Sequence, residues 1–330
     1  GIIGMGIGQQ HAIAYDKHPN FHIKALCDFD LNKLESIKNS YPSTLFTDNY
    51  KNIINDKEIS VVSVASYDNF HATQIIDSIN NKKHVFAEKP LCLTVEELKE
   101  IDKALRLNPE IKLSSNHVLR TNPRFLMMRE KIKRGDFGDI FYLEGDYYWG
   151  RIHKFNEWRA KMDYYSIIHG AAIHMIDLVM WLLNDRPVEV QAVGNAIATK
   201  KHLLDYNSFA VLIMKFKNGI LAKVTGNGGC VHPHHHGLKI FGTQLTAIQN
   251  ISDAYFIESS DENMLSNSIK EPYPAKDQRH NILTSYIDSI IDTSKSPIIT
   301  QKDVFDVMSV CFASEEAMET GKTVSVNYFD

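Results

Sequence analysis

Three glycines that could bind a phosphate open the chain, in the sequence GIIGMGIGQQHA (1–12). The β-branched residues before Gly4 favour a strand, the glycines permit a tight turn, and the following QQHAIAYDKH can form a helix whose N–H groups face that turn. Dinucleotide pyrophosphates bind in such turns. Because Gln9 stands where the usual G-x-G-x-x-G pattern has its third glycine, an ordinary strand–turn–helix explains the pattern equally well.

Asp28 adds a second indication of a dinucleotide site. It ends the next predicted strand, HIKALCD (22–28), at about the 20-residue distance from the middle glycine at which an acid can bind the adenosine ribose. A carboxylate there accepts hydrogen bonds from the ribose hydroxyls and repels a 2′-phosphate. The glycines and Asp28 together predict a site that favours NAD over NADP.

The elements that must position these residues alternate along the first third of the chain. Predicted strands at 44–46, 59–65, 83–88 and 111–116 are separated by predicted helices. These strands are apolar on both faces, which is typical of parallel sheets with right-handed crossovers. We therefore predict an α/β Rossmann domain over residues 1–120.

The pattern changes after about Pro123. A predicted helix is followed by long strands with period-two alternation at 139–149, 209–226 and 238–249, and Asn218-Gly219 predicts a hairpin inside the second of them. A helix at 171–183 and two late helices bracket these strands. We expect residues 121–330 to form an α+β domain with a large, mainly antiparallel open sheet.

Composition narrows the class of protein. The chain has 330 residues, a formal net charge of −4 and a pI near 6.4, so nucleic acid and anionic membranes are not expected partners. The apolar stretch at 167–183 carries two histidines and an aspartate, which favours a buried helix over a membrane span. No C-x-x-C pair or signal peptide is visible, so we expect a cytoplasmic protein whose cysteines are buried, namely Cys27, Cys92, Cys230 and Cys311. Residue 1 is a glycine inside a predicted strand, so we expect the native start to lie upstream.

Several stretches resemble the glucose-fructose oxidoreductase, inositol dehydrogenase and rhizopine-catabolism (Gfo/Idh/MocA) family of sugar and polyol dehydrogenases. Besides the opening turn they are VASYDNFHA (64–72), AEKPL (87–91), IHGAAIHMIDLVMWLL (168–183) and KDVFDVMSVCFASEEAMETGKTVSV (302–326). The resemblance implies NAD-dependent oxidation of a secondary hydroxyl of a sugar, a sugar derivative such as a nucleotide-sugar, or a polyol to a ketone, or the reverse. It also implies a homodimer or homotetramer, with the second domain binding substrate.

Two residues are the expected catalytic groups. Lys89 follows a parallel strand at the sheet edge where ligands bind, and the resemblance implies that it polarises the reacting hydroxyl. His174 matches the general base of the family, a role that suits an imidazole near neutral pH. Asp177, one helical turn later, could orient His174 or be an ordinary helix residue.

The remaining site residues divide between cofactor and substrate. The resemblance, with the glycine pattern, implies a cofactor site made of Gly4, Met5, Gly6, Ile7, Gly8, Asp28, Ser66, His71, Glu88, Lys89 and Asn116. Aromatic and basic residues at 145–165 are typical of a pocket for sugar rings, and equally of a sheet edge with packed aromatics. The expected substrate residues are Arg120, Arg151, His153, Trp158, Arg159, His169 and Asp177.

The chain departs from the family at three points. Gly170 stands where the family often has an aspartate four residues before the base, Tyr67 replaces a proline, and the glycine turn is short. His169 would point about 140° from His174 on a helix, unless it precedes the helix and faces the substrate. Four histidines and a cysteine in CVHPHHHGL (230–238) could suggest a metal, but adjacent histidines seldom point at one centre and no metal is expected.

Two other functions fit the same resemblance. One is a glycosidase that oxidises its substrate transiently with bound NAD and cleaves it by elimination. The other is a ligand-sensing regulator without catalysis, which the glycine at position 170 favours weakly and the retained Lys89 and His174 oppose.

Overall fold

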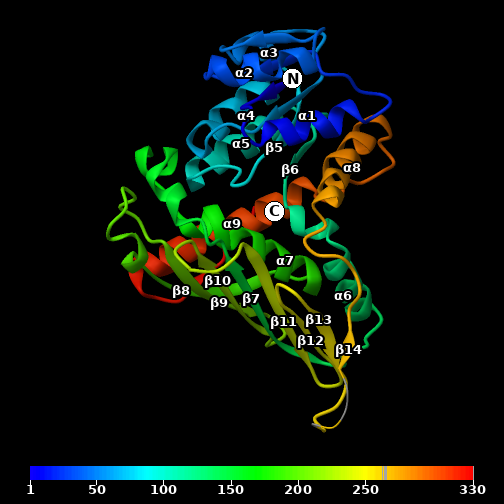
Figure 1. The fold of residues 1–330 in the computed structure, drawn as a ribbon, viewed down its shortest axis with the longest axis vertical. Coiled ribbons are helices and arrows are strands. Elements are labelled where there is room, and N and C mark those ends of the chain that lie inside the picture. Colours follow the sequence, from blue (N-terminus) through cyan, green and yellow to red (C-terminus); the bar gives the residue numbers. More distant parts are fainter. Residues whose placement is uncertain (262, 264–265, 330) are drawn as a thin grey trace. The chain divides into compact units, whose positions relative to one another are not determined.

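The computed structural model describes residues 1–261, 263 and 266–329, and the chain forms two compact units (Figure 1). The first comprises Gly1–His117 with Asp277–Phe305, and the second Val118–Lys276 with Asp306–Asp330. The predicted domain boundary between residues 120 and 121 stays a prediction. Residues 277–305, however, were predicted in the second domain and lie in the first unit. This segment packs with the first unit because α8 (His280–Ile291) contacts α1 (Gly8–Asp16).

A parallel sheet forms the centre of the first unit, as predicted (Figure 1). Within the described chain its six strands are, in spatial order, β3 (Leu45–Thr47), β2 (Ala25–Cys27), β1 (Ile2–Ile3), β4 (Val61–Val64), β5 (His84–Ala87) and β6 (Leu113–Ser115). The helices between them are α1, α2 (Leu31–Ile37), α3 (Lys51–Ile54), α4 (His71–Asn80) and α5 (Val95–Leu107). The strand order reverses at β1, so a crevice is expected at the carboxyl ends of β1 and β4.

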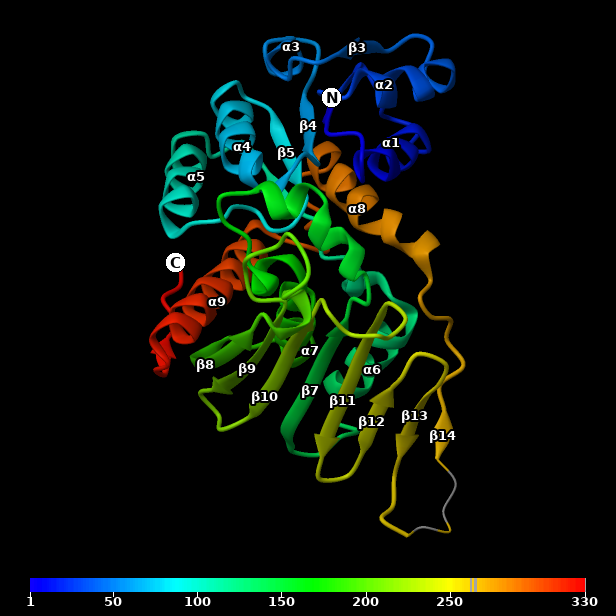
Figure 2. The ribbon, with the colours of Figure 1, turned by 60° about the vertical axis from the view of Figure 1, so that its left-hand side comes forward.

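A mixed sheet forms the second unit, and the predicted architecture is confirmed (Figure 2). Among the described residues its nine strands are, in spatial order, β14 (Asn267–Ser268), β13 (Ala254–Ile257), β12 (Thr246–Gln249), β11 (His235–Gly242), β7 (Ile140–Tyr148), β10 (Leu221–Asn227), β9 (Phe209–Phe216), β8 (Pro187–Asn195) and β15 (Val324–Ser325). All neighbouring strands are antiparallel except β7 and β10. The predicted hairpin at Asn218-Gly219 joins β9 and β10, and Gly219 has the positive φ that such a turn requires.

Helices cover one face of this sheet (Figure 2). α7 (Ile173–Leu183) contacts β7 and β10, α6 (Pro123–Lys133) contacts α7, and Met318 of α9 (Gln301–Thr320) lies beside Gly194 of β8. Side chains alternate accordingly along β9, where Leu212 and Met214 are buried and Ile213 between them is 37% exposed. The close approach of α7 depends on Gly145 in β7, because a Cβ there would lie 3.2 Å from the Met175 Cε atom.

Short helices connect these elements. They are η1 (Lys38–Ser40), η2 (Asp68–Phe70), η3 (Val118–Thr121), η4 (Ile152–Asn156), η5 (Trp158–Lys161), the π-helical turn η6 (Ile168–Ala172), η7 (Ile197–Thr199) and η8 (Lys276–Arg279). None of the helices in the described ranges combines the length and apolarity needed to cross a bilayer.

Candidate active site

The glycine turn joins β1 to α1 in a conformation that needs glycine. Gly4 has φ +91°, and a Cβ atom on it would lie 2.4 Å from the Ala65 carbonyl oxygen. A Cβ on Gly6, in contrast, would meet nothing within 4 Å, so the turn has open space beside it. The helix α1 then begins at Gly8 with no side-chain cap and no acid in its first turn. These features fit a diphosphate, which requires N–H groups, close backbone approach and no negative charge.

Asp28 holds this turn against the end of β2. Its Oδ2 atom accepts a hydrogen bond of 2.7 Å from the Met5 N–H, and its Oδ1 atom accepts one of 2.9 Å from Asp30 N–H. Lys33 Nζ lies 3.6 Å away. A carboxylate oxygen has two lone pairs, so both oxygens can still accept a ribose hydroxyl. The predicted position of Asp28 therefore fits an adenosine ribose, while the hydrogen bond to the turn was not foreseen. Met5 is buried, whereas the side chain of Ile7 is 45% exposed.

Lys89 follows β5 beside a buried carboxylate network in the same unit. Glu88 Oε1 accepts hydrogen bonds from Asn116 Nδ2 at 2.6 Å and from His11 Nε2 at 3.1 Å, and Glu88 Oε2 accepts one from the Lys89 N–H at 3.3 Å. Burial alone would raise the pKa of Glu88, but the hydrogen bond and charge of His11, with Asn116 and Lys89, lower it to about 2. The network therefore fixes the backbone that carries Lys89.

His71 connects the Lys89 turn to the loop after β4. Its Nδ1 atom lies 2.7 Å from the Pro90 carbonyl oxygen, and its Nε2 atom lies 3.2 Å from the Ser66 carbonyl oxygen. The Ser66 hydroxyl donates to Gln74 Oε1 at 2.7 Å. The loops that follow the adjacent strands β4 and β5 are thus tied together by one fully buried ring.

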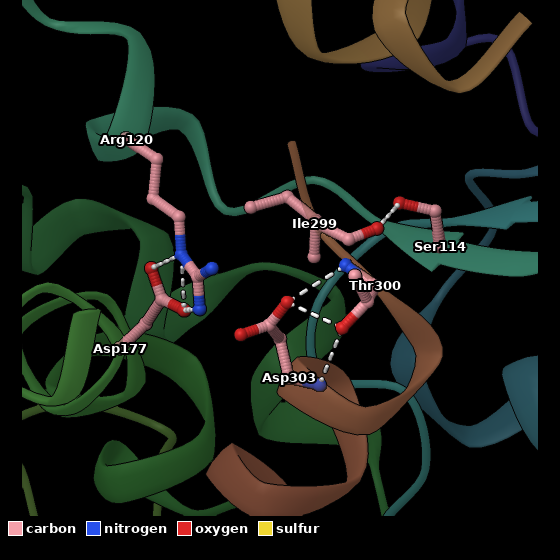
Figure 3. A network of polar contacts seen from close by, with 6 residues as sticks. All are labelled: Ser114, Arg120, Asp177, Ile299, Thr300 and Asp303. Atoms are coloured by element: carbon pink, nitrogen blue, oxygen red, sulfur yellow. Dashed lines mark hydrogen bonds and ion pairs between the residues drawn. The ribbon is translucent and has the colours of Figure 1, made fainter. Parts of the chain in front are cut away.

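A buried ion pair anchors α7 in the second unit. Arg120 of η3 points at Asp177 of α7, and the guanidinium engages both carboxylate oxygens, at 2.7 and 3.1 Å to Oδ1 and 3.2 Å to Oδ2 (Figure 3). Both side chains are almost inaccessible to water. The sequence left open whether Asp177 orients His174 or is an ordinary helix residue, and the structure shows that its charge is compensated by Arg120.

Aromatic and imidazole rings surround His174. The Tyr147 ring lies 5.3 Å from the His174 ring and the His236 ring 5.9 Å, measured between centroids. Tyr147 and His236 are directly opposite each other on β7 and β11 and stack at 4.7 Å. The Tyr147 hydroxyl lies 2.9 Å from His234 Nε2, and the Tyr273 hydroxyl 2.9 Å from His236 Nδ1.

The histidines of the predicted loop form two groups, and His235 and His236 alternate at the start of β11. His234 and His236 lie with Tyr147 and His174, whereas His232 and His235 pack against Tyr148. No group of histidine, cysteine, aspartate and glutamate side chains within the described ranges could hold a metal ion.

The Tyr165 ring fills the space beside Gly170, where the family often has an aspartate side chain. A Cβ atom on Gly170 would lie 2.5 Å from the Tyr165 hydroxyl oxygen, so a larger residue would have to displace that ring. Gly170 lies in the π-helical turn η6, whose first N–H groups at 168 and 169 donate to the Ser166 hydroxyl at 3.0 Å. Ser166 in turn donates to Glu315 of α9. Burial raises the pKa of Glu315 to about 7.

His169 lies in the π-helical turn η6, just before α7. Its ring is 1% exposed, packs edge-on against Phe312, and has no hydrogen-bond partner on either nitrogen among the residues that the structure describes. Burial lowers the pKa of His169 to about 3, so the ring is neutral at physiological pH. The predicted contact of His169 with the substrate stays a prediction.

The other expected substrate residues lie in η4 and η5 or just before them. Arg151 and His153 are exposed. The Arg159 guanidinium carbon lies 4.2 Å from the Trp158 ring centroid and 5.1 Å from that of Trp149. Their assignment to the substrate stays a prediction.

Sequence reasoning missed the group Tyr147, His234, His236 and Tyr273 around His174. Period-two alternation along 139–149 could have indicated that Tyr147 faces the helices, but the strand pairing that brings His236 opposite it depends on a register that single-sequence patterns do not specify.

Two family models match the chain. The model described as "Oxidoreductase family, NAD-binding Rossmann fold" matches residues 1–117, and the GFO/IDH/MocA C-terminal domain matches residues 125–248. A curated relative, the uncharacterized oxidoreductase YrbE of Bacillus subtilis, is 24% identical over 340 residues, which cover 99% of this chain and 96% of that protein.

Solved structures share the fold. Myo-inositol 2-dehydrogenase from Lactobacillus plantarum has a TM-score of 0.84 at 23% identity and covers 99% of this chain and 98% of its own. Scyllo-inositol dehydrogenase from Lactobacillus casei, with bound NAD(H) and scyllo-inositol, has a TM-score of 0.81 at 19% identity and covers 98% of each chain.

The buried ion pair yields a stability prediction. Arg120→Met or Asp177→Leu alone leaves an uncompensated buried charge and should lower the free energy of unfolding by about 3–5 kcal/mol, whereas the double variant should recover most of this loss. Urea denaturation monitored by tryptophan fluorescence measures this free energy. The fluorescence reports on the unit that holds the ion pair, because Trp149, Trp158 and Trp181 all lie in the second unit. Lys215→Met, which breaks an exposed pair with Glu189, is the control and should change little. Equal losses in single and double variants would contradict the prediction.

Asp28 yields a prediction on cofactor choice. Asp28→Asn removes the negative charge beside the expected ribose, so NADH should bind about tenfold more weakly and NADPH more tightly, with help from Lys33. Fluorescence titration of both reduced dinucleotides measures the ratio. Asp30→Asn is a matched control, because asparagine caps α2 as well as aspartate does. An unchanged NADH-to-NADPH preference would refute the role of Asp28.

Proposed function

Because this chain belongs to the Gfo/Idh/MocA family of NAD-binding oxidoreductases, we propose that it oxidises one secondary hydroxyl of a cyclic polyol or sugar to a ketone, or catalyses the reverse reduction. Inositols are the favoured substrates, since two proteins with the same fold are inositol dehydrogenases. Sugars and sugar derivatives remain within the proposal.

One observation carries the proposal. The glycine turn, Ser66 and Lys89 follow β1, β4 and β5, which are adjacent parallel strands of one sheet. The carboxyl ends of such strands, at the point where the strand order reverses, form the ligand crevice of open α/β sheets. A cation at this edge is suited to a reacting hydroxyl, because its charge stabilises the oxygen as it becomes an alkoxide.

The proposed chemistry assigns one task to each of two residues. NAD, when bound, supplies the acceptor for the hydride that leaves the hydroxyl carbon. Lys89 donates a hydrogen bond to the hydroxyl oxygen, and the neutral His174 imidazole accepts the hydroxyl proton. In the reverse direction the His174 imidazolium returns this proton to the carbonyl oxygen.

The charges around His174 favour an uncharged substrate. Asp177 and Arg120 compensate each other, and the rings of Tyr147 and His236 lie close to His174. Such a surface offers hydroxyl, imidazole and aromatic groups to a polyol. Because the charge of Arg120 is neutralised by Asp177, Arg120 is not suited to bind a carboxylate or phosphate of a substrate.

Product analysis separates this proposal from the transient-oxidation alternative. A dehydrogenase releases one NADH for each ketone formed, whereas an NAD-using glycosidase releases aglycone without net NADH. A regulator would bind the ligand and form neither product.

Lys89→Met tests the role of the lysine. The methionine retains the length of the side chain but not its charge, so kcat should fall about 10²–10⁴-fold. NADH binding should weaken much less than kcat falls, because the other expected cofactor residues remain in place. NADH formation with myo- and scyllo-inositol measures the rate. Lys103→Met, an exposed lysine on α5, is the control. A rate unchanged in Lys89→Met would remove Lys89 from the mechanism.

We further propose that the chain is a homodimer or homotetramer that pairs through the sheet face turned away from α7. On this face Val193 is 63% and Ile213 37% exposed, although both are apolar strand residues. Light scattering should find an oligomer for the wild type and dissociation for Ile213→Glu, because the new charge would be buried. Leu107→Glu, on the first unit, should remain oligomeric. A monomeric wild type would refute this proposal.

A further inference from the structure

The segment that follows β7 continues the row of side chains that reaches His174. Trp149 is buried like Tyr147 two residues earlier, and its N–H still donates to the Asn227 carbonyl oxygen of β10 at 2.9 Å. Side chains two residues apart on an extended chain share a face, so the Trp149 ring lies about 7 Å further along the row than the Tyr147 ring. Because the Tyr147 ring is 5.3 Å from that of His174, Trp149 lies next to the group of rings around His174.

Phe155 of η4 anchors the rest of this segment against the sheet. Its ring is fully buried and lies 5.2 Å from the Trp149 ring. It also fills the space beside Gly228, directly after β10, where a Cβ atom would collide with it. The short helices η4 and η5 are therefore held at the end of β7 and β10, and η5 brings Arg159 to Trp149.

Arg159 is held by two tryptophans. Its guanidinium carbon lies 4.2 Å from the ring centroid of Trp158 and 5.1 Å from that of Trp149. Such cation–π contacts fix the position of a guanidinium but do not satisfy its N–H donors. The Arg159 Nη1 atom is buried and has no hydrogen-bond partner within the described ranges. Glu157, the nearest acid in the sequence, lies beside Lys154 instead, with 3.6 Å between Oε2 and Nζ.

We propose that Arg159 binds two neighbouring hydroxyls of the substrate, on the side of the molecule away from the hydroxyl that reacts. A buried N–H donor without an acceptor is costly, and a bound ligand removes this cost. The guanidinium presents a rigid fork of N–H donors, which suits two acceptor oxygens on adjacent atoms. The inference rests on the proposed function and narrows it, because the substrate must then carry a vicinal diol besides the reacting hydroxyl.

The position of Arg159 explains why this diol is remote from the reaction. His174 is assigned to the reacting hydroxyl, and Arg159 packs on Trp149, one strand step beyond Tyr147. A six-membered polyol ring can therefore present one hydroxyl to His174 and an adjacent pair, across the ring, to Arg159. The inositols have no charged group, so hydroxyl oxygens are the acceptors that they offer to a guanidinium.

Two substrates test the proposal in Arg159→Met. scyllo-Inositol has a vicinal diol across the ring from every hydroxyl, whereas cyclohexane-1,2,3-triol lacks the far side of that pattern. The value of kcat/KM is the readout, because unproductive binding does not affect it. For scyllo-inositol it should fall about 10–100-fold, mostly through KM, whereas for the triol it should stay at the wild-type value. Arg159→Lys, which keeps a cation between the indole rings but lacks the fork, should show the same difference between the substrates.

Lys161→Met, at an exposed lysine of the same short helix, is the matched control and should leave both substrates unchanged. Equal losses on scyllo-inositol and on the triol would show that Arg159 only supports the fold of its segment, and would overturn the inference. Preference for glucuronate over scyllo-inositol that is lost in Arg159→Met would also overturn it, because the ligand would then be a carboxylate.

Failure of the proposed function looks different, because no polyol or sugar would then yield NADH with the wild type. Calorimetric titration of the NADH-loaded protein with scyllo-inositol needs no turnover and tests Arg159 in that case too. Binding that is lost in Arg159→Met and retained in Lys161→Met would support the inference. Equal affinity in the two variants, or no binding by the wild type, would overturn it.

Discussion

The buried pairing of Arg120 with Asp177 is the interaction on which the arrangement around His174 depends. A carboxylate and a guanidinium that are both removed from water are tolerated only if each satisfies the other, and the bidentate contact achieves this. It fixes the start of the second unit, at η3, to the middle of α7. Because Asp177 lies one turn after His174, the same contact sets the rotation of the helix that presents the imidazole.

In the first unit, Glu88 is likewise a buried carboxylate that requires stabilising partners. Burial disfavours the charged carboxylate, yet hydrogen bonds from His11 and Asn116 keep it ionised. The backbone of Lys89 is thereby fixed on one side, and the Pro90 carbonyl is fixed on the other by His71. In each unit the backbone that carries the proposed catalytic side chain is thus held by buried polar contacts.

Much of this architecture could be predicted from the sequence, because strong local patterns carried it. Alternating apolar strands and helices predicted the Rossmann sheet, and period-two strands with Asn218-Gly219 predicted the second sheet. The position of α8 with the first unit could not be foreseen, since its apolar stripe does not specify the surface that it covers. Nor could the ring cluster around His174, because residues from β7, β11 and α7 meet there through strand register and helix packing.

The π-helical turn at Ile168–Ala172 allows the length of this helical segment to change by one residue. A π turn accommodates one residue more than the α-helix that continues from it, so deleting a single residue there would restore regular geometry without disturbing the pairing of Asp177. Because the wider turn absorbs the extra residue, the aromatic segment 149–165 before it can keep its place relative to the imidazole when that residue is lost. The turn is therefore a position at which this helix can gain or lose one residue while the residues on either side of it stay where they are.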